Sequence, residues 1–352
     1  MCGRTACTLG QKEICMACSY KSSETGKYVQ PEWKDSTDGK EYCPSYNMPP
    51  THHTPVLISK MHMDKTADHS ERLLQPMVWG LIPFWHKDAD PQSHGLSTIN
   101  CRSEGLMEKK TFSVPIKKGR RCVVVADGFY EWEKKKTGKQ PYLFYFPQRR
   151  GLSVGDESTW KKGYNQELWS PKDGWKGPRV LTIAGLFDVW KSPETEKLMY
   201  SYCVITVPSS PKISWVHHRM PAILDGPEEV QAWLNYEDVD ASNALKLVKP
   251  ISNLEWHAVS PAVGNVKNDS VELVKHYSST SGKKLVGSQK LMSAWLQKES
   301  PKKSPKKEEP EHNAMKQELP DEWDADGNFQ EPPCQGSDHE DEEPPLKKPK
   351  AE

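Results

Sequence analysis

Cys2 is the residue whose position allows the most distinctive chemistry, because it becomes the first residue when Met1 is removed. Initiator methionine is commonly removed when the second residue is small. Cys2 then carries an α-amine and a thiol on adjacent carbons, with reference pKa values of about 8 and about 8.5. An aldehyde condenses with such an amine to a Schiff base, and the thiolate then closes a five-membered thiazolidine ring. The same pair could act as an N-terminal nucleophile in hydrolysis, with the amine as base. A cysteine placed there by chance is the alternative.

A polar segment over residues 97–104, directly ahead of a predicted helix, supplies two further candidates. Asn100 could orient a substrate oxygen, and Arg102 could hold a phosphate through a bidentate contact. Asn47 stands in a turn over residues 44–47 that could present it to a ligand. An ordinary helix cap with surface charge is the alternative interpretation of residues 97–104.

Glu131 stands between two aromatic residues near the end of a predicted strand over residues 121–132. A carboxyl group enclosed by Tyr130 and Trp132 would be desolvated. Its pKa would then rise toward the range that is useful for proton transfer. A solvent-facing strand residue is the alternative.

Two adjacent histidines, His217 and His218, occupy a loop over residues 215–221. Neighbouring side chains of an extended chain point in different directions, so we expect at most one of them to face a given site. A histidine there could serve as acid, base or hydrogen-bond donor to a sugar oxygen. The aromatic segment over residues 79–85 could supply a platform for bases or a wedge at a junction. A structural histidine and core packing are the alternatives for these two segments.

These candidates fall on short elements of a mainly antiparallel fold. Runs rich in Val, Ile, Tyr, Phe and Trp predict strands, over residues 55–60, 74–79, 121–132, 141–146, 179–187 and 200–207. Helix signals are fewer, at residues 228–234 and 241–248. Because long helices do not alternate with the strands, a doubly wound parallel sheet is disfavoured, and we expect a barrel-like or sandwich-like α+β domain. The polar, Gly-rich stretch over residues 149–176 predicts a surface insertion between strands.

The chain of 352 residues has 48 Lys and Arg against 48 Asp and Glu, yet the charge is unevenly distributed. Residues 299–352 carry 16 acidic and 8 basic side chains, so the rest of the chain has a net charge of +8. A basic body favours a polyanion such as nucleic acid or a membrane surface, and an acidic tail could simply solubilise it. No run of about 18 apolar residues is present, which predicts that there is no transmembrane helix. The first residues do not have the layout of a secretory signal.

The nine cysteines are odd in number and irregularly spaced. This predicts free thiols in a reducing compartment rather than a disulfide framework. Cys15 and Cys18 have the spacing of zinc ligands, and nearby in the sequence are Cys7, Cys43, His52 and His53. A structural zinc site usually needs four ligands, often in two paired clusters. Because one such pair is present, we predict no metal and no cofactor, with a zinc site as the alternative.

Five segments, in their order and rough spacing, resemble the SOS-response-associated peptidase family, whose eukaryotic members crosslink to abasic sites in DNA. They are residues 1–4 (Met-Cys-Gly-Arg), 79–83 (Trp-Gly-Leu-Ile-Pro), 100–104 (Asn-Cys-Arg-Ser-Glu), 127–132 (Asp-Gly-Phe-Tyr-Glu-Trp) and 217–221 (His-His-Arg-Met-Pro). The resemblance covers about residues 2–275. It implies a single domain around a curved antiparallel sheet, with a basic channel for single-stranded DNA.

The resemblance also implies roles for individual residues. Cys2 is the nucleophile, Asn100 positions it, and Glu131 transfers protons at the sugar and the amine. His217 matches the family histidine near the sugar oxygen. The implied function is a sensor of abasic sites in single-stranded DNA that forms a covalent thiazolidine link, which could reverse, and shields the lesion at replication forks. The residues expected to contact DNA are Arg4, Asn47, Trp79, Pro83, Trp85, Arg102, Arg121 and Arg219.

Residues 276–352 are rich in Ser, Lys, Glu, Asp and Pro, a composition that predicts a disordered, acidic tail. Within it Gln289, Met292, Trp295 and Leu296 resemble a motif that docks on the replicative sliding clamp, with Leu296 where an aromatic residue is usual. A terminal helix that packs back on the domain is the alternative. Basic clusters at residues 301–307 and 345–350 resemble nuclear import signals, so we expect a nuclear protein at chromatin.

Two other functions remain open from the sequence. One is a thiol peptidase that acts on other proteins or removes its own Met1, since the family takes its name from an N-terminal cysteine. The other is a non-enzymatic reader of modified DNA bases. A reader would use the aromatic residues and arginines, but it gives no reason for Cys2.

Overall fold

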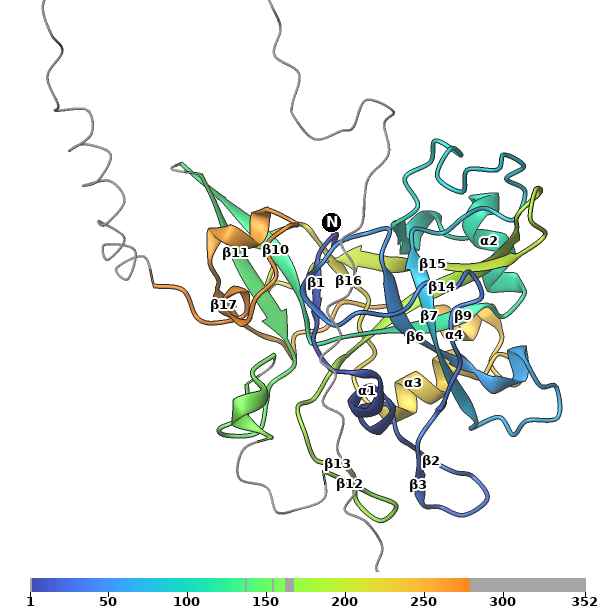
Figure 1. Cartoon of the computed structure of the whole chain (residues 1–352), viewed down its shortest axis with the longest axis horizontal. Helices are drawn as coiled ribbons and strands as arrows, with labels where there is room; N and C mark the ends of the chain where they lie inside the picture. The colour runs from blue at the N-terminus through green and yellow to red at the C-terminus, as the bar shows by residue number, and fades with distance from the viewer. Residues whose placement is uncertain (1, 137, 154, 162–167, 279–352) are drawn as a thin grey trace, which may run out of the picture. The chain divides into compact units, whose positions relative to one another are not determined.

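The computed structural model in Figure 1 describes residues 2–136, 138–153, 155–161 and 168–278. The sliding-clamp motif expected at residues 289–296 and both basic clusters lie outside these residues, so they stay predictions, as does the domain boundary near residue 275. The described part contains no helix that is long and apolar enough to cross a membrane.

Short strands dominate the described residues. The strands are β1 (Thr5–Cys7), β2 (Tyr20–Lys21), β3 (Tyr28–Val29), β4 (Glu32–Trp33), β5 (Ser45–Met48), β6 (His53–Ser59), β7 (Arg72–Trp79), β8 (Asn100–Arg102), β9 (Arg121–Ala126), β10 (Gly128–Lys135), β11 (Gly138–Tyr145), β12 (Trp169–Ser170), β13 (Gly174–Trp175), β14 (Leu181–Lys191), β15 (Leu198–Pro208), β16 (Arg219–Pro221) and β17 (Glu255–Ala258). The helices are α1 (Gln11–Ala17), α2 (Lys110–Lys117), α3 (Pro227–Leu234) and α4 (Ala241–Leu245).

Five strands form a closed barrel on the right of Figure 1. Strands β15, β14, β9, β6 and β7 pair in that order, and β7 pairs in parallel with β15, where Trp79 lies opposite Tyr202. The strands bury aliphatic side chains such as Leu57, Val124 and Ile183, which suit a pleated surface packed on one side. The predicted α+β class with a barrel-like, mainly antiparallel sheet is confirmed.

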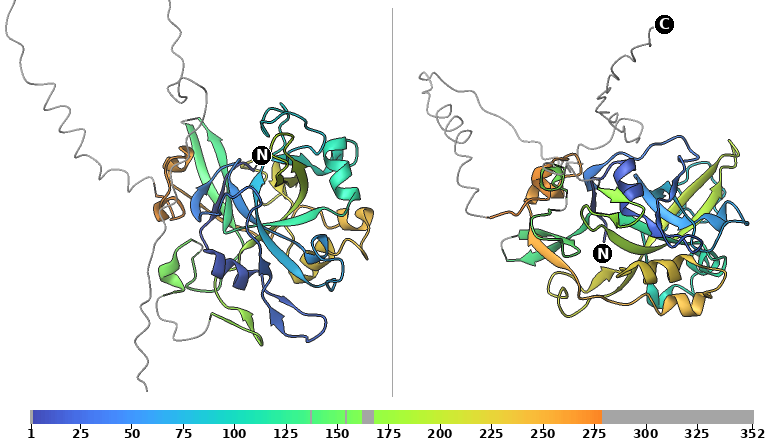
Figure 2. Two further views of the ribbon diagram at one scale, coloured as in Figure 1. Left: turned by 45° about the vertical axis from the view of Figure 1, so that its right-hand side comes forward. Right: turned by 90° about the horizontal axis from the view of Figure 1, so that it is seen from below.

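A second sheet, on the left of Figure 1, pairs strands in the order β17-β11-β10-β1-β5, and Figure 2 shows it beside the barrel from two further directions. The sequence predicts one strand over residues 121–132, but β9 ends in the barrel at Ala126 and β10 begins in the second sheet at Gly128. A Cβ at Gly128 would lie 2.7 Å from the carbonyl oxygen of Phe144 on β11, so glycine permits this close crossing. The prediction of one continuous strand is therefore wrong at Asp127.

Asp127 ties β1 to the junction between the two sheets. Its carboxylate accepts hydrogen bonds from the backbone N–H of Thr8 at 2.8 Å and from the Thr8 hydroxyl at 2.6 Å, and its own N–H donates to the carbonyl oxygen of Ala6 at 2.8 Å. Burial raises the pKa of Asp127 to about 6, although the two bonds from Thr8 act to lower it. The strand that follows Cys2 is thus held by a buried carboxyl group.

The sequence predicts that residues 149–176 form a surface insertion, but part of this segment is buried. They include β12 and β13, and they bury Trp160 against Trp175, with ring centroids 5.9 Å apart. The helix predicted after residues 97–104 is present as α2, which begins at Lys110 and contains Pro115, although proline normally ends a helix.

The substitution Asp127→Asn tests the buried carboxyl group, since it removes the ionisation but keeps an oxygen that can accept from Thr8. The folded-state pKa of about 6 lies above the ordinary value of 3.8, so ionisation of Asp127 destabilises the fold as the pH rises from about 4 to about 6. Across that interval, we expect the free energy of unfolding of the wild type to fall by on the order of 2 to 3 kcal/mol relative to Asp127→Asn. Urea denaturation of both proteins across that pH range measures the difference. A difference that does not change with pH would contradict a raised pKa.

Candidate active site

Cys2 stands just before β1 and lies against Asn100 of β8. Asn100 Nδ2 donates a hydrogen bond of 2.7 Å to the carbonyl oxygen of Cys2. Parallel pairing with β15 positions β8, so that Asn100 lies opposite Val204. Asn100 Oδ1 is buried and accepts no hydrogen bond within the described residues. It is therefore available as an acceptor for a donor on a substrate.

Glu131 on β10 is 5% exposed. Burial raises its pKa, and a backbone hydrogen bond from Trp132 opposes that rise. The register places Glu131 opposite Tyr142 of β11, on the same face of the sheet. Tyr130 and Trp132 point to the other face, where they pack with Leu143. The predicted desolvation is confirmed, but the predicted enclosure by Tyr130 and Trp132 is wrong, because successive side chains of a strand alternate.

His217 lies in the loop between β15 and β16. Its Nδ1 lies 3.0 Å from the amide nitrogen of Arg219 and 3.1 Å from the carbonyl oxygen of Arg219. Either neutral tautomer is therefore held in place, and Nε2 can accept or donate a proton without movement of the ring. Burial lowers the pKa of His217. The sequence predicts that the side chains of His217 and His218 point in different directions. This is wrong, since their rings stack with centroids 4.4 Å apart.

Cys2, Glu131 and His217 share one electrostatic environment. Burial raises the pKa of the Cys2 thiol well above its usual range, and the charge of Glu131 adds to that rise. The positive charge of His218 lowers the pKa of Glu131, and the His218 ring stacks on that of His217. The structure thus brings together, at the start of β1, the four residues that the sequence suggests for catalysis, which are Cys2, Asn100, Glu131 and His217.

Arg4 and Asn47 satisfy one another's hydrogen bonds. Nη1 of Arg4 donates to Oδ1 of Asn47 at 2.6 Å and to the carbonyl oxygen of Val263 at 3.0 Å. The amide group of Asn47 donates to the carbonyl oxygens of Asn265 and Asn268, and Asn47 is buried. This contradicts the prediction that Asn47 is presented to a ligand, because its polar atoms hold Arg4 and the segment after β17.

Three more residues of the expected DNA-contacting set belong to the core. Arg121 is buried, and its guanidinium donates to the carbonyl oxygens of Asn235 and Val239, each at 2.8 Å. Trp79 is also buried, with its indole N–H bonded to a backbone carbonyl at 3.0 Å. Pro83 is buried as well. Because these side chains are packed in the core, the structure gives no support to the prediction that they contact DNA.

Arg219 forms a two-pronged ion pair with Glu104. Nη1 lies 2.5 Å from Oε1, and Nη2 lies 3.0 Å from Oε2. The hydrogen bonds from Arg219 lower the pKa of Glu104 to about 2. Glu104 thus occupies the two guanidinium nitrogens through which Arg219 could have made a bidentate contact with DNA. Arg102 and Trp85 are exposed and remain accessible to a DNA strand.

Sequence reasoning missed Asp127, Thr8 and Glu104 as residues that support the site. Asp127 and Glu104 stand inside two of the segments that carry the family resemblance, which is the signal that could have found them. Their partners could not be identified, because Thr8 is 119 residues from Asp127 and Arg219 is 115 residues from Glu104.

The candidate zinc ligands do not converge. Cys15 and Cys18 are free thiols, and His53 instead lies 2.8 Å from a carboxylate oxygen of Asp38. In the part of the chain that the structure describes, no group of three or more His, Cys, Asp or Glu side chains is placed to hold a metal. The zinc alternative therefore lacks supporting geometry there.

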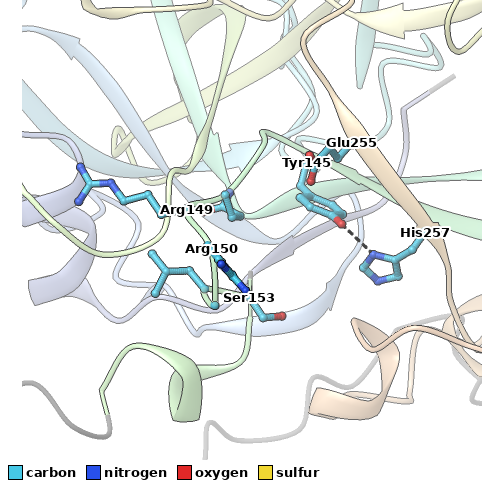
Figure 3. A pocket seen from close by; sticks show the side chains of 9 residues that line it. Tyr145, Arg149, Arg150, Ser153, Glu255 and His257 are labelled. Carbon is cyan, nitrogen blue, oxygen red and sulfur yellow. Dashed lines mark hydrogen bonds between the residues drawn. The ribbon is translucent and has the colours of Figure 1, made fainter.

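A separate pocket of about 230 Å³ lies beside the second sheet (Figure 3). Its lining includes Arg149, Arg150, Tyr145 of β11 and His257 of β17, and the Tyr145 hydroxyl lies 3.1 Å from His257 Nδ1. Because side chains alternate along β11, Tyr145 faces away from the side of the sheet on which Glu131 lies. The pocket is therefore not part of the candidate active site.

Comparison with known proteins agrees with this geometry. The family model described as SOS response associated peptidase (SRAP) matches residues 1–266. The chain belongs to this family. Curated relatives named abasic site processing protein HMCES, from Xenopus tropicalis and Rattus norvegicus, are each 45% identical to it, covering 86% and 88% of this chain and 87% of each relative. Abasic site processing protein YoqW of Bacillus subtilis (strain 168) is 30% identical, covering 67% of this chain and 88% of its own length.

A solved structure of a protein from Bacteroides thetaiotaomicron shares the fold. It is 20% identical in sequence, with a TM-score of 0.54, and the match covers 79% of this chain and 100% of that chain. The predicted family resemblance is thus confirmed for the part of the chain that contains the candidate active site.

Two substitutions at Asn100 test its hydrogen bond to Cys2. Asn100→Ala leaves the buried carbonyl oxygen unpaired, which costs about 1 to 3 kcal/mol. Asn100→Asp keeps the shape but sets a carboxylate against that oxygen, so we expect it to destabilise the fold at least as much at neutral pH. Its stability should recover on acidification, because a protonated carboxyl group can donate, whereas Asn100→Ala should show no such recovery. Thermal denaturation at neutral pH and near pH ~4 checks this. Wild-type stability of Asn100→Asp at neutral pH would contradict the assigned donor.

Proposed function

We propose that this protein processes abasic sites in DNA by linking Cys2 covalently to the lesion. The named relatives are abasic site processing proteins. The observation that carries the proposal is the neighbourhood of Cys2, which contains a buried carboxyl group on Glu131, the amide of Asn100 and a neutral imidazole on His217. An aldehyde, such as that of a ring-opened abasic sugar, is the substrate class with which an N-terminal cysteine forms a stable ring.

The reaction begins with the mature chain, whose first residue is Cys2. The unprotonated α-amine attacks the aldehyde carbon, and the carbonyl oxygen takes up a proton to become a hydroxyl group. After a second protonation this hydroxyl leaves as water, which gives the imine. The thiol then adds its sulfur to the imine carbon while its proton passes to the nitrogen, and the thiazolidine closes. Overall one water is released, and nothing is oxidised or reduced.

Glu131 is the group suited to move these protons. Its raised pKa allows it to take a proton from the attacking amine and to return it to the departing hydroxyl. His217 can donate from Nε2 to the sugar oxygen, and Asn100 holds the backbone of Cys2 through its carbonyl. The raised pKa of the Cys2 thiol keeps it protonated in the resting protein, which favours attack by the amine first.

Single-stranded DNA is the form of substrate that we propose. The basic body of the chain suits a phosphate backbone. Arg102 lies two residues after Asn100 and is exposed, and Trp85 is 40% exposed, so both are accessible to a strand. The linked protein would cover the lesion and leave no imine to drive strand cleavage. This suits protection of replication forks in the nucleus, and the predicted clamp motif and import-like clusters belong to the same proposal.

The two alternatives fit the site less well. A non-covalent reader of modified bases gives no role to the shared environment of Cys2, Glu131 and His217. Hydrolytic removal of Met1 by these same residues is compatible with the covalent chemistry, because amide cleavage also needs a thiol and a proton carrier.

Covalent capture can be read from a denaturing gel. Protein that begins at Cys2, mixed with a single-stranded oligonucleotide carrying one abasic site, should give a heat-stable shifted band, and an intact strand should not. Cys2→Ala should lose this band, because ring closure needs the thiol. Cys2→Ser keeps the amine and should give a band only after borohydride reduction of the imine. Cys15→Ser, a change at another buried cysteine, serves as the control and should retain the band. Absence of the band from wild-type protein with a confirmed Cys2 terminus would contradict the proposal.

The substitution Glu131→Gln tests the proton carrier. We expect the rate of capture to fall by about 10²- to 10⁴-fold, the usual contribution of general acid–base catalysis. In the wild type the rate should fall as the pH drops through the raised pKa of Glu131, because the protonated carboxyl group can no longer accept a proton from the amine. That decline should vanish in Glu131→Gln, while the titration of the α-amine near pH ~8 remains. Single-turnover rates across this pH range measure both effects. An unchanged acidic decline in Glu131→Gln would show that another group carries the proton.

A further inference from the structure

Three aromatic rings gather on the face of the second sheet that carries Glu131. Trp215 meets Tyr142 edge to face at a centroid distance of 4.8 Å and lies 6.0 Å from Trp256. We call these three residues the Trp215 platform. Trp215 is 42% exposed although it is a large hydrophobic residue, and its indole N–H already donates to the carbonyl oxygen of Lys212 at 3.1 Å. What it offers to solvent is therefore ring surface.

Phe144 of the second sheet packs against two rings of the Trp215 platform. Phe144 and Trp256 are cross-strand partners on β11 and β17, with centroids 6.0 Å apart, and Phe144 also lies 6.4 Å from Trp215. Tyr142 shares their face because it is two residues from Phe144 along β11. Two of the three rings of the Trp215 platform thus stand on strands, Tyr142 on β11 and Trp256 on β17, and Trp215 packs against them from its loop.

The Trp215 platform adjoins the candidate active site through both the chain and the sheet. Trp215 precedes His217 by two residues in the same loop. Tyr142 lies opposite Glu131 in the register of β10 and β11. A strand whose abasic sugar reaches Glu131 and His217 therefore has a neighbouring nucleotide beside these rings.

Cations flank the Trp215 platform on two sides. Lys135 Nζ lies 5.8 Å from the ring centre of Tyr142, and Lys212 Nζ lies 5.5 Å from that of Trp256. The hairpin formed by β10 and β11 adds three more exposed lysines, Lys134, Lys136 and Lys139. A second acidic residue of this face besides Glu131, Glu133, lies 3.1 Å from Lys135 and accepts a hydrogen bond from the Tyr142 hydroxyl at 3.0 Å.

We propose that the Trp215 platform stacks one unpaired base of the DNA strand that flanks the abasic site. Exposed rings among lysines match a planar base joined to a phosphate backbone, since stacking and charge neutralisation then act on the same nucleotide. This inference rests on the proposed function and adds to it a subsite for one neighbouring nucleotide. The subsite accepts any base, because every base has a flat face.

The test uses binding of single-stranded oligonucleotides that carry an unreactive abasic analogue. In a series of strands, the base at one flanking position at a time is replaced by a spacer that keeps the phosphate. Wild-type protein should lose about tenfold in affinity when the base at one particular position is removed. Trp215→Ala should bind the complete oligonucleotide with a similar loss of affinity and should lose no further affinity when that base is removed. Trp215→Phe keeps a ring, so its affinity should again depend in part on that base. Leu198→Ala, at an equally exposed apolar residue at the start of β15, is the control and should bind as the wild type does.

The outcomes separate this inference from the proposed function. Wild-type affinity of Trp215→Ala, or a loss that is the same for every strand in the series, would overturn the subsite, provided that thermal denaturation shows the variant to be folded. Failure of the wild type to capture a reactive abasic strand would instead contradict the proposed function, whatever the binding series gives. Capture by the wild type, together with coupling between Trp215 and one base position, supports both.

Discussion

The anchoring of β1 is the constraint on which the rest of the site depends. Cys2 can react as an aminothiol only when it is the first residue, and a chain end is normally among the most mobile parts of a protein. Here β1 pairs with β10 on one side and β5 on the other, and Thr8 bonds twice to the buried carboxylate of Asp127. The freedom that a terminus ordinarily has is thus removed, and its reactive groups meet their partners in one geometry.

Burial sets the chemistry of that geometry. Desolvation disfavours the charged forms of Glu131 and the Cys2 thiol, and it also favours a neutral His217. Glu131 with its raised pKa and His217 with its lowered pKa are both suited to exchange protons in the proposed reaction, whereas the Cys2 thiol stays protonated. The surrounding hydrogen bonds, such as that from Asn100 to Cys2, supply the polar contacts that a buried site needs.

The sequence was sufficient to select the side chains that the fold brings together around Cys2. It was insufficient for side chains whose place depends on remote partners. The four residues suggested for catalysis each stand in a short segment with a chemical reason for their type. Arg121 and Asn47 resemble DNA ligands when only their own segments are considered, because the carbonyl groups that accept their hydrogen bonds lie 114 or more residues away. Apolar runs predict the strands, but they do not predict the break at Asp127. The chain crosses there from one sheet to the other without interrupting the apolar pattern. The stacked pair His217 and His218 depends on a loop conformation that alternation does not describe.

The parallel pairing of β7 with β15 closes the barrel between segments that are far apart in the sequence. Contacts between segments far apart in the sequence form late in folding, because the long intervening loop must close first. β15 pairs with β7 and also with β8, the strand that carries Asn100. Under the proposed function, a newly made or unfolded chain that begins at Cys2 has the aminothiol but not the side chains that the fold gathers around it. Under that proposal, full reactivity toward an aldehyde comes only with the closed barrel.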